Sequence, residues 1–256
     1  MSHLNYKIIG EGHPIVFLHG LFGMLDNWQT FARKLSEHGY MCIIVDQRNH
    51  GRSFHSPEFN YELLSDDLHT FLDEMHIFKT HLLGHSMGGK TALKFTSEYE
   101  DYVEKLIVVD IGLKSYRGGH ELILDALNAV QLEEMNDREA VQEFLGTFGF
   151  GKEVILFLMK NLSRGKDGNF YWKMNLKSLT DHYDEILESV MIRGEIDVPT
   201  LFVKGEKSRY IIDEDWPLIH SIFPNAELQT VKGAGHWVHA DAPEELLSSV
   251  LKFLMN

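Results

Sequence analysis

The chain is 256 residues long, with 44% hydrophobic and 24% charged residues, an ordinary composition for one folded domain. Its formal net charge of -14 argues against a nucleic-acid partner, because binding phosphate groups requires clustered lysine and arginine. The single Cys42 excludes an internal disulfide, no signal peptide is visible, and no apolar run reaches the ~18 residues of a membrane span, so we expect a cytoplasmic monomer or small homo-oligomer.

Short apolar runs alternate with amphipathic segments in the N-terminal half, which is the pattern of strand–helix units and a parallel sheet. The apolar runs predict strands at 14–18, 41–45, 79–83 and 106–109. The amphipathic segments predict helices at 26–38, 61–75 and 89–99. A polar loop follows the second strand, and we expect Asp46 and Arg48 to brace its tight turn by hydrogen bonds and an ion pair.

The alternation stops at about residue 113 and returns only after residue 194. The sequence between them is rich in Met, Leu and acidic residues, with helical periodicity and no convincing strand. Strands are again predicted at 199–203 and 227–231, before a helix that starts near Pro243. We therefore predict an α/β core of residues 1–112 and 195–256, with residues 113–194 as a helical cap over the carboxyl edge of the sheet. A helical subdomain without any part in binding is the alternative.

A serine motif lies between a predicted strand and a predicted helix. Residues 84–88 read Gly-His-Ser-Met-Gly and match G-x-S-x-G. The tight turn leaves no room for side chains at the two glycines, and it holds Ser86 in a strained backbone that lifts the hydroxyl into the cleft. The N-terminus of the following helix then points at developing negative charge. The alternative is a small-residue turn with an ordinary exposed serine.

The same region also fits a phosphate-binding loop. Residues 84–91 match G-x-x-x-x-G-K-T, with Lys90 as the phosphate lysine, and such a loop likewise joins a strand to a helix. The apolar run that ends at Asp110 is compatible with the acidic strand that helps to hold magnesium in nucleotide hydrolases. A nucleotide-binding protein is therefore the rival interpretation.

Two other segments favour a serine hydrolase over a phosphate-binding loop, which explains neither of them. Residues 19–23, His-Gly-Leu-Phe-Gly, follow the first strand, where the backbone N–H of Leu21, or of Phe22 in the alternative register, can join that of Met87 in an oxyanion hole. Residues 233–237, Gly-Ala-Gly-His-Trp, follow the last strand, where small neighbours let His236 reach Ser86 as its base.

The segments HGLFG, DQRNHGRS, LLGHSMGGK and GAGHWVHAD together resemble the α/β-hydrolases, in particular the YbfF-like bacterial esterases and their abhydrolase-domain-11 relatives. The resemblance extends over residues 19–243, nearly the whole chain. It implies an α/β-hydrolase fold with a mostly parallel sheet of about eight strands flanked by helices, a helical cap and no cofactor. It also implies a serine esterase that cleaves short to medium acyl esters through an acyl-enzyme, with acyl-CoA thioesters as an open alternative.

The acid of the implied Ser-Asp-His triad is not at the position where many members of that superfamily carry it. The loop after residues 199–203 has Ser208 there, and a serine cannot stabilise the imidazolium that His236 becomes. Asp110 ends an earlier strand at the same sheet edge as Ser86, and the resembling esterases are similar in placing their acid after this strand. We therefore assign Asp110; the alternatives are Glu206, Asp213 and Asp215.

The remaining expectations concern the pocket and other functions. Phe22, His85 and Trp237 are predicted to lie at the substrate pocket, His85 packing beside the nucleophile. Six cap aromatics either line an acyl pocket or pack in a core: Phe144, Phe148, Phe150, Phe170, Tyr171 and Trp172. His236 and His239 lack the further ligands of a metal pair, so no metal is expected there. A carbon–carbon bond hydrolase, a cofactor-free perhydrolase and a non-enzymatic ligand receptor are the alternatives on this fold.

Overall fold

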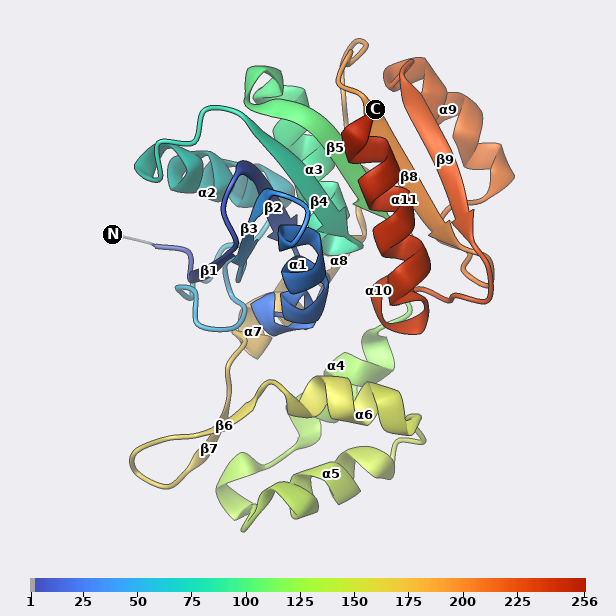
Figure 1. Cartoon of the computed structure of the whole chain (residues 1–256). Helices are drawn as coiled ribbons and strands as arrows, with labels where there is room; N and C mark the ends of the chain where they lie inside the picture. The colour runs from blue at the N-terminus through green and yellow to red at the C-terminus, as the bar shows by residue number, and fades with distance from the viewer. Residues whose placement is uncertain (1–2) are drawn as a thin grey trace.

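The computed structural model describes residues 3–256, and its central feature is a seven-stranded sheet with the order β1-β3-β2-β4-β5-β8-β9 (Figure 1). The strands are β1 (Tyr6–Ile9), β2 (His13–Leu18), β3 (Tyr40–Val45), β4 (Thr80–His85), β5 (Val103–Val109), β8 (Thr200–Gly205) and β9 (Ala226–Val231). β1 pairs antiparallel with β3, and every other neighbouring pair is parallel. The predicted mostly parallel sheet is confirmed, with seven strands in place of about eight.

Among the seven strands of this sheet, β1 is the one that is not predicted from the sequence. Its residues are exposed or half-buried, and Lys7 interrupts the apolar run. Edge strands carry such residues because only one side of the strand pairs with the sheet. The other six strands lie within a few residues of their predicted bounds. The inner strands read as largely apolar runs because they are covered on both faces, whereas the edge strand β9 has a mixed sequence with alternating burial over its first four residues.

Helices cover both faces of the sheet, and the side chains of β5 show how the two layers are built. Leu106 and Val108 pack into one core with α2 (Tyr61–Glu74), α3 (Met87–Glu98) and α9 (Trp216–Ile222). Ile107 and Val109 pack into the opposite core with α1 (Gln29–Ser36) and α11 (Pro243–Met255). Successive residues of a strand face opposite sides, so one apolar run supplies both cores.

The predicted helices are present with shifted ends. The segment predicted at 26–38 is a 3-10 turn at Leu25–Asn27 followed by α1, and α3 begins at Met87, two residues before its predicted start. Helix α2 starts as predicted, because Asn60 caps it by accepting a hydrogen bond from the Leu63 amide at 2.8 Å. A short helix, α10 (Val238–Asp241), precedes α11.

The segment between β5 and β8 lies beyond the carboxyl ends of the strands (Figure 1). It contains α4 (Glu121–Ala129), α5 (Arg138–Gly146), α6 (Lys152–Met159), α7 (Leu176–Asp181) and α8 (Tyr183–Leu187). The prediction that it holds no strand is wrong: β6 (Leu162–Arg164) and β7 (Phe170–Trp172) form an antiparallel hairpin. Strands of three residues are too short to display an alternating pattern in the sequence.

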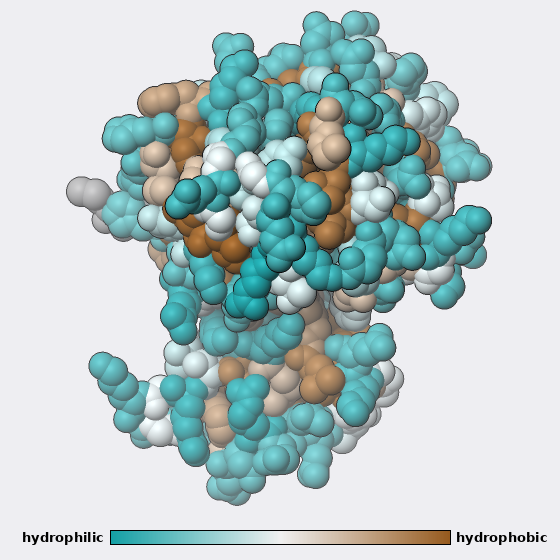
Figure 2. Space-filling view, in the orientation of Figure 1, coloured by the Kyte–Doolittle hydropathy of each residue, from teal (hydrophilic) through white to brown (hydrophobic). Residues whose placement is uncertain are grey.

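The surface drawn in Figure 2 is mostly hydrophilic, with apolar side chains in separate small areas. Among residues 3–256, no helix is both long enough and apolar enough to cross a membrane. The third hydrophobic cluster joins the two parts of the molecule, because Leu21, Phe22 and Met87 of the α/β part pack there with side chains from α4 to α8. The carboxyl edge of the sheet therefore meets the inserted segment around the serine motif.

Candidate active site

Ser86 lies in a sharp turn between β4 and α3. Its φ of 52° is in the left-handed region, which is strained for a residue with a side chain. A Cβ atom at Gly84 would lie 2.2 Å from the carbonyl oxygen of Gly88, and one at Gly88 would lie 2.3 Å from that of Leu18. Both glycines of the motif are therefore required by close backbone approach, and they allow the turn that presents the serine hydroxyl.

Three side chains from the carboxyl edge of the sheet form a continuous hydrogen-bonded row. The Nε2 atom of His236 lies 3.0 Å from Oγ of Ser86, and its Nδ1 atom lies 2.8 Å from Oδ2 of Asp110. Ser86 follows β4, Asp110 follows β5 and His236 lies in the loop after β9. In this geometry the imidazole can accept a proton from the hydroxyl while the carboxylate holds its other nitrogen.

The carboxylate of Asp110 is fully buried and held by several donors. Oδ1 accepts a hydrogen bond from the Gly205 amide at 2.9 Å, and Oδ2 accepts one from the hydroxyl of Ser208. Ser208, which stands where many members of the superfamily carry the acid, thus contacts the same oxygen of Asp110 that binds His236. Asp110 itself has a φ of 52°, so the turn after β5 is as sharp as the one after β4.

The carboxylates of the three alternative acids contact groups other than His236. Glu206 accepts from the amide of Gly233 at 2.9 Å. Asp213 lies 3.5 Å from Nζ of Lys204, and Asp215 lies 2.5 Å from Nζ of Lys114. The structure therefore brings Asp110, and none of these three, to His236.

Two rings fix the orientation of His236. Tyr210 stacks on it with ring centroids 3.9 Å apart and an interplanar angle of 17°. Nε2 of His85 donates to the backbone carbonyl of His236 at 2.9 Å, which requires a protonated Nε2. Burial lowers the pKa of His85 well below its usual value, so the ring is neutral. His85 packs beside the nucleophile as predicted, whereas nothing in the sequence singles out Tyr210.

The loop after β2 lies against Ser86. A Cβ atom on Gly20 would be 3.3 Å from Cβ of Ser86. Within residues 3–256, the amides of Leu21 and Phe22 donate to no other group. The amide of Met87 is the first of a helix and so has no intrahelical acceptor. The N–H groups of Leu21, Phe22 and Met87 thus have no acceptor among the described residues.

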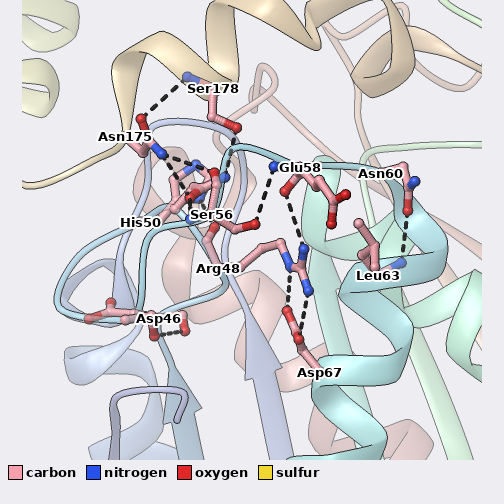
Figure 3. Close-up of polar contacts among 12 residues, drawn as sticks. Asp46, Arg48, His50, Ser56, Glu58, Asn60, Leu63, Asp67, Asn175 and Ser178 are labelled. Atoms are coloured by element: carbon pink, nitrogen blue, oxygen red, sulfur yellow. Dashed lines mark hydrogen bonds and ion pairs between the residues drawn. The ribbon is translucent and has the colours of Figure 1, made fainter. Parts of the chain in front are cut away.

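The polar turn after β3 contacts this loop through Asp46, and Figure 3 shows the other contacts of the turn, with Asp67 and with Asn175. Asp46 accepts from the amides of Leu25 at 2.7 Å and Arg52 at 2.9 Å. The expected ion pair within the turn is wrong: Arg48 forms a bidentate pair with Asp67 of α2, at 2.5 and 2.8 Å. Arg48 therefore points to α2, while Asp46 points to the loop after β2.

The same turn also holds the inserted segment. Asn175 donates from its amide to the carbonyl of Asn49 at 2.8 Å and from its side chain to that of Ser56 at 3.0 Å. Ser178, one turn along α7, accepts from Nδ2 of Asn49 at 2.9 Å (Figure 3). These contacts fasten α7 to the α/β part near the active site.

His19 connects the polar turn to the loop after β2 and must be neutral to do so. Its Nε2 accepts from the Gln47 amide at 3.0 Å, and its Nδ1 donates to the Gly20 carbonyl at 2.9 Å. Burial lowers the pKa of His19 to about 4 from 6.5. Protonation would remove the acceptor for Gln47 and place a charge in the interior.

Lowering the pH should therefore reduce the free energy of unfolding already at pH values above those at which the carboxylates take up protons. Between pH 6.5 and about 4 the unfolded chain takes up a proton at this position that the folded chain does not, so stability falls as the pH falls. From pH 7.5 to pH 5, His19 alone contributes a loss of about 2 kcal/mol in the free energy of unfolding. Urea unfolding of the wild type and His19→Gln at both pH values measures this difference. The exposed His38→Gln serves as control, and an equal pH loss in all three proteins would contradict the prediction.

Two hollows flank Ser86. One is lined by Ser86 and Trp237 of the α/β part together with His120, Ile123 and Phe157 of the inserted segment. The other has Leu21, Met87 and Tyr210 on its walls, again with His120. Phe22 and Trp237 lie in the first hollow as predicted, and Trp237 packs on Phe157 with ring centroids 5.2 Å apart.

His120, Ile123 and Phe157 line the first hollow, and the sequence reveals none of them as a pocket residue, since none belongs to a motif. The six aromatics named from sequence do not line either hollow. Phe148 instead lies between Phe144 and Phe150, at centroid distances of 5.7 and 6.0 Å. Tyr171 is exposed, and the other five aromatics pack in or against the core of the inserted segment.

Lys90 is buried, and its ammonium group bonds to backbone carbonyls of the inserted segment. Its ammonium group donates to the carbonyls of Ile186, Leu187 and Glu188 at the end of α8, and it lies 4.9 Å from the ring centroid of Tyr116. Burial lowers the pKa of Lys90 to about 7. These contacts give the lysine of the apparent phosphate-binding motif a structural place, joining α3 to α8.

Millimolar Mg-ATP should accordingly leave the melting temperature unchanged. A ligand that binds the native state raises the melting temperature by mass action, and Lys90 has no free donor direction with which to hold a phosphate. Differential scanning fluorimetry with and without Mg-ATP tests this, with Lys90→Met as the matched variant. A saturable rise in the wild type that Lys90→Met abolishes would restore the nucleotide-binding interpretation.

Comparisons with known proteins show the family of the chain. The model of the alpha/beta hydrolase fold family matches residues 13–243. The chain is 38% identical to a putative esterase/lipase of Haemophilus influenzae over 94% of this chain and 82% of that protein. It is 36% identical to the Esterase YbfF of Escherichia coli, over 94% and 92%. It is also 36% identical to the sn-1-specific diacylglycerol lipase ABHD11 of Danio rerio, over 98% and 82%. Among solved structures, a marine microorganism esterase covers 99% of this chain and 100% of its own, with a TM-score of 0.96 and 39% identity.

Proposed function

Because this chain belongs to the α/β-hydrolase fold family and is a carboxylic ester hydrolase, we propose that it cleaves its substrates through an acyl-enzyme on Ser86. The observation that carries the proposal is the hydrogen-bonded row from Oγ of Ser86 through His236 to Asp110. In this proposal Ser86 is the nucleophile, His236 the base and Asp110 the acid.

The proposed reaction has two steps. His236 takes the proton of Ser86 at Nε2 as Oγ attacks the ester carbonyl carbon, and the resulting oxyanion accepts from the N–H groups of Met87 and Leu21, with Phe22 as the alternative to Leu21. The tetrahedral intermediate collapses, the bond to the alcohol oxygen breaks and His236 returns the proton to the alcohol. Water then attacks the acyl carbon while the same imidazole takes its proton. The bond from the acyl carbon to Oγ breaks, His236 returns the proton to Ser86, and the acid is released.

Asp110 is proposed to stabilise the imidazolium that forms in each step. Its carboxylate is fully buried, so solvent screens its interaction with His236 only weakly. The donors at Gly205 and Ser208 fix both oxygens, which keeps Nδ1 of the imidazole protonated and Nε2 free to accept. No proton has to move to the aspartate itself.

We propose that residues 113–194 act as a cap over the site. His120, Ile123 and Phe157 from this segment form one wall of the first hollow, so a substrate in it contacts both parts of the molecule. The contacts of Asn175 and Lys90 fasten the same segment at two further places. A monomer or small homo-oligomer in the cytoplasm remains a prediction from the single cysteine and the sequence composition.

The substrates that fit the site best are uncharged oxygen esters with short to medium acyl chains. The hollows are small, with about 480 and 360 Å³ of empty space including their open mouths. Burial lowers the pKa of His120 to about 4, so this cap residue is neutral at pH 7. The net charge of -14 repels polyanions such as coenzyme A esters at long range.

A series of p-nitrophenyl esters should show this preference. We expect kcat/KM for the butyrate to exceed that for the laurate by about tenfold or more, because each methylene that does not fit is costly in a close-packed hollow. Phe157→Ala should raise kcat/KM for the octanoate relative to the acetate by removing a wall of the hollow. Phe148→Ala, which removes an aromatic ring of the same segment away from both hollows, is the control. A coenzyme A thioester that outperforms all oxygen esters would overturn the substrate assignment.

A further inference from the structure

A cluster of two histidines and a glutamate lies at the end of the sheet opposite the active site. His13 starts β2, His81 is the second residue of β4 and Glu104 is the second residue of β5. These three strands are neighbours in the sheet. One ligand atom from each side chain lies within 4.8 Å of the other two. The reaction described above uses none of these residues.

The register of the sheet shows why the three side chains meet. His13 and His81 continue the alternation of Ile15 and Leu83, so both face the side of the sheet that α1 and α11 cover. Glu104 continues the alternation of Leu106 and would face the other side of a regular strand. An irregularity intervenes, because Thr80 pairs with Val103 and His81 with Lys105, which leaves Glu104 without a partner in β4.

Such a bulge redirects a side chain across the sheet. The carboxylate of Glu104 consequently contacts Nε2 of His13. The rings of His13 and His81 lie 4.4 Å apart between centroids. The ligand atoms of all three side chains thus lie close together near the start of β4.

The burial of His81 indicates that the cluster lacks a partner. His81 is 6% exposed, and its Nδ1 atom is buried without a hydrogen bond to any group in residues 3–256. A buried polar atom that makes no hydrogen bond is destabilising, so native proteins normally supply a partner. The neighbouring cation, Lys105, is turned away, because its ammonium group donates to the carbonyls of Phe253 and Leu254 at 3.0 and 2.9 Å.

We propose that His13, His81 and Glu104 bind a divalent transition-metal ion, with Zn²⁺ as the best match. Two imidazoles and one carboxylate are a ligand set that suits zinc and its neighbours in the first transition row, whereas Mg²⁺ and Ca²⁺ prefer oxygen alone. Ligand bonds of about 2.0–2.2 Å require the three atoms to draw closer than 4.8 Å. The side chains of His13 and Glu104 are 38% and 33% exposed, which leaves them free to rotate inward.

The ion ties three strands together and takes no part in ester cleavage. His81 and Ser86 lie five residues apart on one extended segment, which separates them by about 17 Å. Removing the metal therefore leaves turnover unchanged in buffers of ordinary pH, and the binding test is independent of the catalytic proposal.

Titration of tag-free, EDTA-treated protein with Zn²⁺ tests the site, by calorimetry and by melting temperature. We expect one ion per chain and, at about 100 times the Kd, a rise in melting temperature of about 5–10 °C. Co²⁺ in place of Zn²⁺ should give the visible absorption of a low-symmetry cobalt complex. His13→Gln and His81→Gln should each weaken binding by at least tenfold, and Glu104→Gln should do so while retaining the shape of the side chain.

Two controls locate the ion. His220→Gln removes an exposed histidine elsewhere on the surface, and His236→Gln removes the histidine of the candidate active site, so both should bind zinc with wild-type affinity. Because His81 is buried and its variant can fail to fold, the half-exposed His13→Gln provides the second measurement. No saturable binding to the wild type, or unchanged affinity in folded His13→Gln, overturns the proposal. Loss of binding in His236→Gln assigns the ion to the active site and overturns it as well.

Discussion

Ser86→Ala should lower turnover of p-nitrophenyl butyrate by ~10⁴-fold or more while the fold is retained. Removing the nucleophile of a serine hydrolase leaves only binding and oxyanion stabilisation, which is why the loss is this large. The Oγ atom makes one described hydrogen bond, to Nε2 of His236 at 3.0 Å, and its removal adds no volume to the turn. Circular dichroism and the melting temperature check that the variant is folded.

Covalent labelling supplies a second measurement of the same role. A fluorophosphonate should modify the wild type once, at Ser86, and it should leave Ser86→Ala unlabelled. Ser208→Ala is the matched control, because it removes another hydroxyl near His236 and should still be labelled. Modification at a different residue, or an unlabelled but folded wild type, would remove the acyl-enzyme proposal.

Asp110→Asn should lower turnover by about 10⁴-fold. The carboxylate accepts from Nδ1 of His236 at 2.8 Å, and an amide in its place favours the tautomer in which Nε2 carries the proton and cannot accept one from Ser86. The corresponding change in a trypsin-type protease has an effect of this size. Steady-state kinetics of the folded variant measures the loss. Near-wild-type turnover would mean that the acid lies elsewhere.

The three acids in other contacts are the controls for Asp110. Glu206→Gln, Asp213→Asn and Asp215→Asn should each change turnover less than about tenfold, or less than ~1.4 kcal/mol of barrier. Their carboxylates contact Gly233, Lys204 and Lys114 and do not reach His236. A large loss in one of them, with Asp110→Asn active, would transfer the assignment to that residue.

A double variant tests whether the carboxylate can move to the loop after β8. The hydroxyl of Ser208 contacts the same oxygen of Asp110 that binds His236. Asp110→Asn combined with Ser208→Asp should therefore recover part of the activity that Asp110→Asn loses. No recovery in a folded double variant would show that a carboxylate at 208 is not equivalent to one at 110.

The sequence by itself determined the fold class and the elements that carry the candidate triad. Strands covered on both faces are largely apolar, so β2 to β5 and β8 can be predicted from their apolar runs. The turn at Ser86 has room only for glycine at positions 84 and 88, so its motif can be recognised in the sequence. The assignment of Asp110 combined its place at the sheet edge where ligands bind with Ser208 in the usual acid position and with the resemblance to esterases that carry their acid after this strand.

The tertiary structure alone decided which residues complete the site. Tyr210 stacks on His236, and His120 and Phe157 line the hollow beside Ser86, but all three belong to no motif and come from loops or the inserted segment. Lys90 shows the opposite case, because its motif fits a phosphate-binding loop while the fold directs its ammonium group to the carbonyls of α8. The pattern of a sequence segment indicates which residues its own strand, helix or turn requires. A contact between segments a hundred residues apart depends instead on how the whole chain packs.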